Sequence, residues 1–371
     1  MRFKKAILIF CVFFVLGGLN SCHVVRYFTL NTADVKDFKR FPADTVYPGN
    51  HNFEFKHAVP EINIVPRANI TFRDNDFEDF LREKKTLAFL VIRNDTILYE
   101  KYFDGFNRKS ILPSFSVTKS IVSALVGIGI AEGWIAGVDD KVSDYLPELA
   151  ENGFDRVSIR NLLNMRSGIN YSEGYYNPFG KMAKFYYGKN LAKYVRKLKV
   201  KSQAGKNYKY QSANTQILGM ILERSSGKKL PEILETYIWK KAGMKYEATW
   251  NMDSRKHKNT KAYCCLNARS GDFARFARLY LADGRFEGTA VIPEEWIRKT
   301  LQNTTDSRDS QNYPYHFGWR VIDGNILFAK GILGQYIYID RSKKLIILRF
   351  GKRNKKVEWV ELFSQIGSEI K

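Results

Sequence analysis

The stretch LPSFSVTKSIVSALVGIGIAEG, residues 112–133 of a chain of 371, decides the fold. Beyond residue 120 its apolar side chains recur at helical spacing up to Gly133, a typical helix stop. Ser116 and Lys119 stand three residues apart at the start of this predicted helix and therefore share one face. A serine hydroxyl becomes a nucleophile when a base removes its proton, and a neutral lysine can be that base. The stretch predicts a catalytic Ser–Lys pair, although a solvated helix start has the same pattern.

Two later segments strengthen this prediction. Tyr210 begins the sequence YQSANTQILG, in which a second apolar run of helical spacing follows the tyrosine. Residues 329–331 read Ala-Lys-Gly between two strand-like stretches, and a glycine there allows the backbone to approach a substrate closely. Taken alone, the tyrosine would more often be a packing residue and the Ala-Lys-Gly sequence an ordinary strand end.

The three segments, in this order, resemble the marks of the serine β-lactamase and penicillin-binding-protein superfamily. Those marks are Ser-x-x-Lys, a Tyr- or Ser-x-Asn element and a Lys/His-Thr-Gly strand. The similarity is greatest to the class C-like branch, which includes esterases, D-specific peptidases and aminohexanoate-dimer hydrolases. Residues 132–149 and 159–169 are also similar to this branch, and the resemblance covers about residues 80–350.

The resemblance implies an α+β, β-lactamase-like fold. This is an antiparallel sheet of about five strands flanked by the terminal helices, with an inserted all-helical domain at about residues 120–250. The sequence agrees, because strand-like runs stand before and after a helical middle. A hairpin is expected at 87–92 and 96–102, turning near Asn94-Asp95. Later strands are expected at 317–322, 325–329, 335–339 and 345–350, and a last helix at 357–370.

The resemblance also implies a role for each matching residue. Ser116 matches the nucleophile that accepts the acyl group, and Lys119 matches its partner. Tyr210 matches the tyrosine that moves a proton between the nucleophile, the lysine and the leaving group. The backbone N–H groups of Ser116 and Ile332 match the oxyanion hole, where fixed donors face developing negative charge. Whether Lys119 or Tyr210 is the main base stays open.

Two positions depart from the superfamily pattern. Ser212 stands where the Tyr-x-Asn element has asparagine, although Asn214 follows two residues later. Ala329 stands where the strand motif has a cation. Lys330 occupies the next position, which in a strand points to the opposite face, so we expect its side chain to point away from the site. These departures disfavour efficient β-lactam recognition but leave acyl transfer intact. The candidate substrate contacts are Ser212, Asn214, Asn267 and Gly331.

Histidine and cysteine offer no competing chemistry. The five histidines show no H-E-x-x-H spacing, and Ser116 lacks a G-x-S-x-G context. No C-x-x-C pairs with another, so neither a metal site nor a cofactor is expected. Cys264 and Cys265 are adjacent in what reads as a buried strand, and adjacent residues rarely have disulfide geometry. We therefore expect this pair to be packing residues.

The N-terminus predicts export. Residues 1–5 are a charged start, and residues 6–19 are an apolar run of about 14 residues, short of the ~20 that a membrane span needs. Leu19-Asn20-Ser21-Cys22 then resembles a bacterial lipobox. Residues 1–21 are interpreted as a lipoprotein signal peptide and Cys22 as the lipidated residue, which acyl chains hold at a membrane facing the periplasm or the cell exterior. A simple signal peptide or an uncleaved anchor is the alternative.

Composition agrees with an exported enzyme. The net charge of +22 favours anionic surfaces, and the export signal disfavours nucleic acid as a partner. Residues 22–75 are interpreted as a tether and N-terminal extension, and 76–371 as the hydrolase domain. The expected function is a membrane-anchored serine hydrolase that acts on an ester or amide through an acyl-enzyme. A D-specific peptidase, a β-lactamase and a non-catalytic binding or sensor lipoprotein remain alternatives, and the oligomeric state stays open.

Overall fold

The computed structural model describes residues 23–30, 32–62, 77–302, 307–353 and 357–370. The predicted signal peptide and Cys22 lie outside these ranges. Within them, no helix combines the length and the apolar character needed to cross a bilayer.

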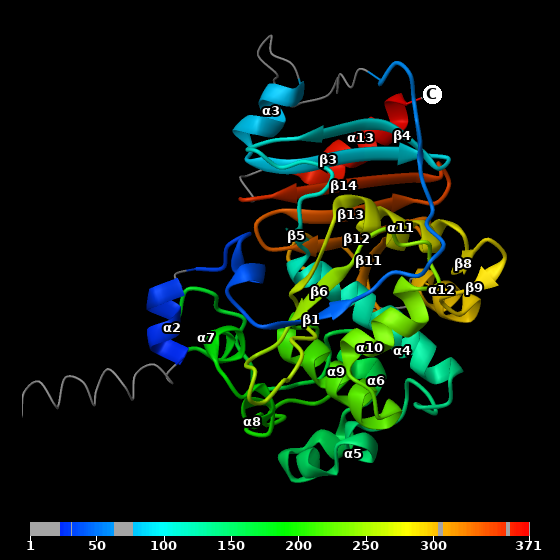
Figure 1. Ribbon diagram of the computed structural model, residues 1–371. Helices are drawn as coiled ribbons and strands as arrows, with labels where there is room; N and C mark the ends of the chain where they lie inside the picture. Colours follow the sequence, from blue (N-terminus) through cyan, green and yellow to red (C-terminus); the bar gives the residue numbers. More distant parts are fainter. Residues whose placement is uncertain (1–22, 31, 63–76, 303–306, 354–356, 371) are drawn as a thin grey trace, which may run out of the picture.

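A sheet of eight strands forms the upper half of the molecule as seen in Figure 1, and its strand order is β10-β11-β12-β13-β14-β3-β4-β2. Its strands are β2 (Lys56–His57), β3 (Thr86–Arg93), β4 (Thr96–Tyr102), β10 (Tyr315–His316), β11 (Trp319–Ile322), β12 (Ile326–Gly331), β13 (Gln335–Asp340) and β14 (Leu345–Gly351). All neighbours are antiparallel except β2 and β4. The α+β class is confirmed, but the expected sheet of five antiparallel strands is too small. The two-residue edge strands β2 and β10 are too short to show a periodicity in the sequence.

The predicted hairpin is confirmed in β3 and β4. Its two turn residues, Asn94 and Asp95, have φ angles of 48° and 57°. Left-handed conformation at both central positions gives a turn whose twist matches that of the flanking strands, and asparagine and aspartate tolerate it well. The four later strand predictions and the last helix also correspond to observed elements, β11 to β14 and α13 (Trp359–Glu369).

Helices cover both faces of the sheet. On one face α3 (Phe77–Glu83) and α13 pack aromatic and aliphatic side chains against alternate residues of the strands, among them Phe89 and Ile347. On the other face Leu90 and Leu348 belong to the large core that the sheet shares with α11 (Ser270–Leu281) and the helical insertion. Because both faces are covered, β3 and β14 are apolar along almost their whole length.

The helical insertion lies between β4 and β10 in the sequence. Its helices are α4 (Thr118–Ala131), α5 (Val142–Tyr145), α6 (Ile159–Leu163), α7 (Lys181–Tyr187), α8 (Leu191–Val195), α9 (Ser212–Ser226) and α10 (Leu230–Leu234), with α12 (Glu294–Leu301) near the sheet edge. A small second sheet has the order β1-β6-β7-β5, with strands β1 (Ala43–Val46), β5 (Leu112–Pro113), β6 (Ala248–Asn251) and β7 (Leu266–Ala268). A two-stranded ribbon joins β8 (Arg285–Phe286) to β9 (Thr289–Ala290). Helix α4 packs against α9 and is buried along nearly its whole length.

The N-terminal segment is part of the packed structure. Helix α2 (His23–Leu30) lies against α7, with Tyr27 packed edge-on against Tyr187 and Arg26 donating to the Tyr187 carbonyl at 2.6 Å (Figure 1). Strand β1 pairs with β6, and the ring of Phe41 covers the amine of Lys261 at 3.2 Å. Residues 23–30 and 32–46 therefore lie along the helical insertion.

A buried arginine ties the centre of the sheet to the turn after β12. Arg349 on β14 donates to the Gly334 carbonyl at 2.7 Å and to the Lys84 carbonyl at 2.8 Å. Its guanidinium lies 3.8 Å from the centre of the Trp359 ring on α13. These contacts fix the turn that joins β12 to β13.

We expect Arg349→Met to lower the free energy of unfolding by about 2–5 kcal/mol, because one buried and one partly buried carbonyl group lose their donors. Urea unfolding followed by circular dichroism measures the change. Lys344→Met, which removes an exposed cation from the turn between β13 and β14, is the matched control and should change stability by less than about 0.5 kcal/mol. Equal midpoints for the two variants would contradict this role for Arg349.

Candidate active site

Ser116 lies on a sharp turn between β5 and α4. The turn is the short 3₁₀ helix η2 (Phe115–Val117), and Phe115 adopts a φ of +45° while its ring is buried. A bulky residue in the left-handed region costs of order 1–3 kcal/mol and persists only where the surroundings enforce it. Ser114 supplies part of that restraint, because its hydroxyl donates to the Leu266 carbonyl at 2.7 Å. The turn places Ser116 on the wall of a cavity.

Lys119 lies in the first turn of α4, directly against the serine. Its amine is 2.8 Å from the Ser116 hydroxyl oxygen and also donates to the Tyr263 carbonyl at 2.9 Å. The side chain is only 3% exposed. The structure thus brings the predicted pair into hydrogen-bond contact, at a distance that permits proton transfer from the hydroxyl to the amine.

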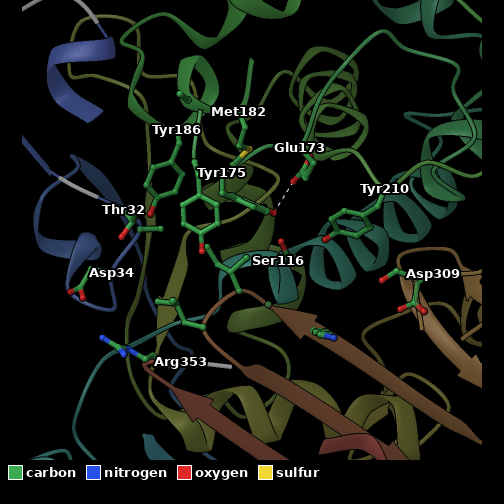
Figure 2. A pocket seen from close by; sticks show the side chains of 18 of the residues that line it. Thr32, Asp34, Ser116, Glu173, Tyr175, Met182, Tyr186, Tyr210, Asp309 and Arg353 are labelled. Carbon is green, nitrogen blue, oxygen red and sulfur yellow. Dashed lines mark hydrogen bonds between the residues drawn. The ribbon is translucent and has the colours of Figure 1, made fainter. Parts of the chain in front are cut away.

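Tyr210 lies in the same cavity, just before α9. The Lys119 amine is 5.1 Å from the centre of its ring, and Tyr315 packs edge-on against the other side. Figure 2 shows the ring with its hydroxyl turned toward Ser116. All three residues predicted to carry the chemistry therefore gather at one place.

The end of β12 closes the other side of the site. A Cβ atom on Gly331 would lie 2.7 Å from the Ser114 carbonyl oxygen, closer than carbon and oxygen can approach, so only glycine fits. This close approach brings Ile332 onto the same cavity wall as Ser116. The two predicted oxyanion donors, the backbone N–H groups of Ser116 and Ile332, thus belong to segments in direct contact.

The motif Ala-Lys-Gly on β12 has its cation in an unusual place. Ala329 is buried in the core, and Lys330 takes the opposite strand face, but the expectation that this turns the lysine away from the site was wrong. The Lys330 amine donates to the side-chain oxygen of Gln311 at 2.5 Å, yet the residue still borders the cavity. Burial, and then repulsion by Arg320, lower the pKa of Lys330. The cavity is therefore bordered by a lysine, but one displaced from the motif's usual first position.

The cavity next to Ser116 has a volume of about 1120 Å³ (Figure 2). Three parts of the chain form it: the N-terminal segment, the helical insertion and the sheet edge. Its polar and aromatic lining includes Thr32, Asp34, Glu173, Tyr175, Tyr176, Tyr186, Tyr187, Lys209, Arg308, Asp309, Arg320, Lys352 and Arg353. A space of this size accepts a ligand larger than a simple ester.

Glu173 is a site residue that the sequence analysis missed. Its carboxylate accepts hydrogen bonds from the Tyr175 hydroxyl at 2.9 Å, from the Ser212 hydroxyl at 2.5 Å and from the Ser212 backbone N–H at 2.8 Å. Burial, and then the charge of Glu173, raise the pKa of Tyr175, which keeps that phenol protonated. The sequence could have drawn attention to Glu173, because it is the only acidic residue between positions 156 and 222.

Three of the residues predicted to contact the substrate instead form hydrogen bonds within the protein. Ser212 holds Glu173, while Asn214 accepts from the Ser167 hydroxyl at 2.5 Å and donates to the Met165 sulfur. Asn267, on β7, donates to Asn251 at 2.9 Å and to nearby carbonyls. Among the described residues, the cavity lining includes Gly331 but not Ser212, Asn214 or Asn267.

The sequence also did not predict that Asp309, Arg320 and two residues of the N-terminal segment line the cavity. Asp309 accepts from Arg320 at 2.6 Å, and both border the cavity beside Tyr210. No local motif marks these residues, because Asp309 comes from a loop and Arg320 from β11, both far from Ser116 in the sequence. The same holds for Thr32 and Asp34, which reach the cavity through the packing of the N-terminal segment against α7.

Cys264 and Cys265 form a disulfide, so the expectation of simple packing was wrong. Both side chains are nevertheless buried. The segment is a turn and not a regular strand, and Cys265 has a φ of +74°. The strand alternation that would place neighbouring side chains on opposite faces is therefore absent. The disulfide directly follows Tyr263, whose carbonyl accepts from Lys119.

Comparison with known proteins agrees with this geometry. The family model for Beta-lactamase matches residues 74–366, and the chain belongs to this family. The chain is 29% identical over 314 residues to the 6-aminohexanoate-dimer hydrolase of Paenarthrobacter ureafaciens, covering 79% of each sequence. It is 30% identical over 146 residues to the D-aminopeptidase of Brucella anthropi, covering 36% of this chain and 25% of that protein.

Solved structures show the same fold. A structure from Bacillus anthracis, provisionally named a 6-aminohexanoate-dimer hydrolase, superimposes with a TM-score of 0.77 at 22% identity, covering 89% of this chain and 90% of that one. A class C beta-lactamase gives a TM-score of 0.56 at 17% identity over 79% of this chain and 94% of that chain. The family match and the relatives together identify this protein as a serine hydrolase that acts on amide or ester bonds.

The contact between Lys119 and Ser116 leads us to predict how substitutions in the site change the rate of hydrolysis. We expect Lys119→Met and Tyr210→Phe each to lower kcat by about 10²-fold or more, because each removes a group that moves the proton. Ser116→Ala should abolish acylation. Hydrolysis of p-nitrophenyl acetate measures these effects, and Lys206→Met is a control lysine outside the cavity. Turnover of wild-type size in Lys119→Met would remove the base assignment.

Proposed function

We propose that this protein is a membrane-anchored hydrolase that cleaves a linear amide or ester through an acyl-enzyme on Ser116. The observation that carries the proposal is the 2.8 Å contact between the Ser116 hydroxyl and the buried Lys119 amine, facing a cavity of about 1120 Å³. A serine with a lysine partner in a walled cavity can be activated without a histidine.

The reaction follows from the positions of these groups. Lys119, in its neutral form, takes the hydroxyl proton while the Ser116 oxygen attacks the substrate carbonyl carbon. The backbone N–H groups of Ser116 and Ile332 face the negative oxygen that develops. Tyr210 passes the proton to the leaving amine or alcohol, whose bond to the carbonyl carbon breaks. Water then attacks the acyl-enzyme, the same groups accept its proton, and Ser116 is restored.

The cavity wall supports a linear substrate with polar ends. Six cationic side chains (Lys209, Arg308, Arg320, Lys330, Lys352 and Arg353) and three acidic ones (Asp34, Glu173 and Asp309) border it. Charges of both signs suit a short amide that carries an ionic group, such as the dimer named for the Paenarthrobacter relative. The D-aminopeptidase relative keeps a peptidase as the second candidate. A β-lactam is a poor fit, because Ala329 offers no cation for its carboxylate.

A fluorophosphonate probe tests the catalytic proposal directly. Ser116 should be labelled, and Ser116→Ala, with its cavity otherwise intact, should not. We expect hydrolysis of small esters and short amides, and nitrocefin turnover with kcat/KM below about 10⁴ M⁻¹s⁻¹. Nitrocefin turnover above that range would make the protein a β-lactamase. Binding of short amides without labelling would identify a non-catalytic binding protein.

The membrane anchor rests on the N-terminal sequence. Leu19-Asn20-Ser21-Cys22 matches a lipobox, and α2 begins at the residue after Cys22. The disulfide of Cys264 and Cys265 supports an exported location, because disulfides persist in oxidising compartments.

Cys22→Ala should release the protein to the soluble fraction or block removal of the signal peptide. The reason is that acyl chains contribute ~0.8 kcal/mol of membrane affinity per buried CH₂ group. Fractionation of cells and mass spectrometry of the mature N-terminus measure both effects. Unchanged fractionation together with unchanged processing would exclude a lipoprotein.

A further inference from the structure

One segment of the chain has an extreme charge bias. Between Glu173 and Glu223 the sequence has no acidic residue and ten basic ones. The basic residues are Lys181, Lys184, Lys189, Lys193, Arg196, Lys197, Lys199, Lys201, Lys206 and Lys209. We name residues 181–209 the basic segment. It contains α7, α8 and the loop that leads to Tyr210.

The side chains of the basic segment are mostly in solvent. Besides Lys189, seven are exposed: Lys193, Arg196, Lys197, Lys199, Lys201, Lys206 and Lys209. None of these seven forms an ion pair with a carboxylate of the described residues, although surface arginines and lysines elsewhere do, such as Arg160 with Asp139 and Arg224 with Glu148. A clustered charge of one sign that is not neutralised locally creates a field toward solvent.

Three lysines of the basic segment, Lys181, Lys184 and Lys209, are close enough to repel one another. Burial, and then the charges of Lys184 and Lys209, lower the pKa of Lys181. These three residues come from the two ends of the basic segment, so the fold gathers positive charge that is separated in sequence. An opposing anionic surface would relieve this repulsion.

Exposed aromatic side chains stand beside the same helices. Phe28 on α2 is 67% exposed, and Tyr176 and Phe179, on the loop before α7, are 83% and 71% exposed. Helix α2 packs on α7 (Figure 1). Large aromatic rings left in water next to lysines are typical of surfaces that bind at a membrane interface, where one part of the side chain enters the headgroup region.

We propose that α2, the loop before α7 and the basic segment form a docking face for an anionic lipid bilayer. The lysines would pair with headgroup phosphates, and Phe28, Tyr176 and Phe179 would enter the interface. A soluble polyanion such as a wall polymer would satisfy the lysines but would leave the aromatic rings in water. Since α2 begins directly after Cys22, an anchor at that residue would hold this face against the bilayer. The inference goes beyond the proposed hydrolase and does not require catalysis.

Lysine acetylation of the full chain in vesicles tests the docking face. The protein is incorporated into phosphatidylcholine vesicles with or without 30% phosphatidylglycerol, and flotation confirms equal association. A water-soluble acetylating reagent followed by mass spectrometry then measures each lysine. We expect acetylation of Lys199, Lys201 and Lys206 to be at least about threefold slower with the anionic lipid, and this protection to disappear at high salt.

Charge-reversal variants distinguish binding through the docking face from a general attraction of the positively charged protein to anionic lipid. The triple variant Lys193→Glu, Arg196→Glu, Lys197→Glu should lose the protection of the remaining lysines. The matched control Arg298→Glu, Lys241→Glu, Lys344→Glu makes the same charge change at exposed positions outside the basic segment and should keep it. Hydrolysis of a soluble ester shows that both variants are folded.

Three results would overturn the proposal. They are equal protection in neutral and anionic vesicles, equal loss of protection in the two triple variants, and protection by soluble polyphosphate as strong as that by vesicles of the same phosphate content. The last would assign the face to a polymer. Failure of the anchor would appear in flotation, and failure of the hydrolase would appear in probe labelling, so neither can be confused with failure of the docking face.

Discussion

The amine of Lys119 is the point at which the separate parts of this protein meet. It lies between the hydroxyl of Ser116 and the carbonyl of Tyr263, so it joins the start of α4 to the turn that carries the Cys264–Cys265 disulfide. A lysine that is almost fully buried needs acceptors for its N–H groups, and these two supply them. The position of Ser116 relative to Lys119 is thereby coupled to packing between the helical insertion and the second sheet.

Sequence reasoning succeeded where function depends on local spacing. Ser116 and Lys119 are three residues apart on one helix, so their contact follows from helical geometry. Gly331 was recognisable because close backbone approach requires the absence of a side chain, and the Ser114 carbonyl is the atom that requires it here. The hairpin at Asn94 was equally readable, since its turn conformation favours few residue types.

Sequence reasoning failed where contacts join distant segments. Ser212 looked like a substrate ligand because of its distance from Tyr210, but its hydroxyl is bound by Glu173, 39 residues away. Asn267 is similarly taken up by neighbours across the second sheet. The disulfide depended on a single residue, Cys265, adopting a left-handed conformation, which strand-like composition does not reveal. A polar residue near a motif is thus ambiguous until its partners are known.

The contribution of Thr32 and Asp34 to the cavity wall has a geometrical consequence. Thr32 follows Cys22 by ten residues, which would span at most about 35 Å if they were fully extended. Eight of these residues form helix α2, which is only about 12 Å long, so the actual distance is shorter. If Cys22 carries the lipid, the cavity next to Ser116 lies within a few nanometres of the bilayer. The enzyme would meet molecules at the membrane surface and not those held deeper in a surrounding wall. The same residues would set both its reach and the shape of its active site.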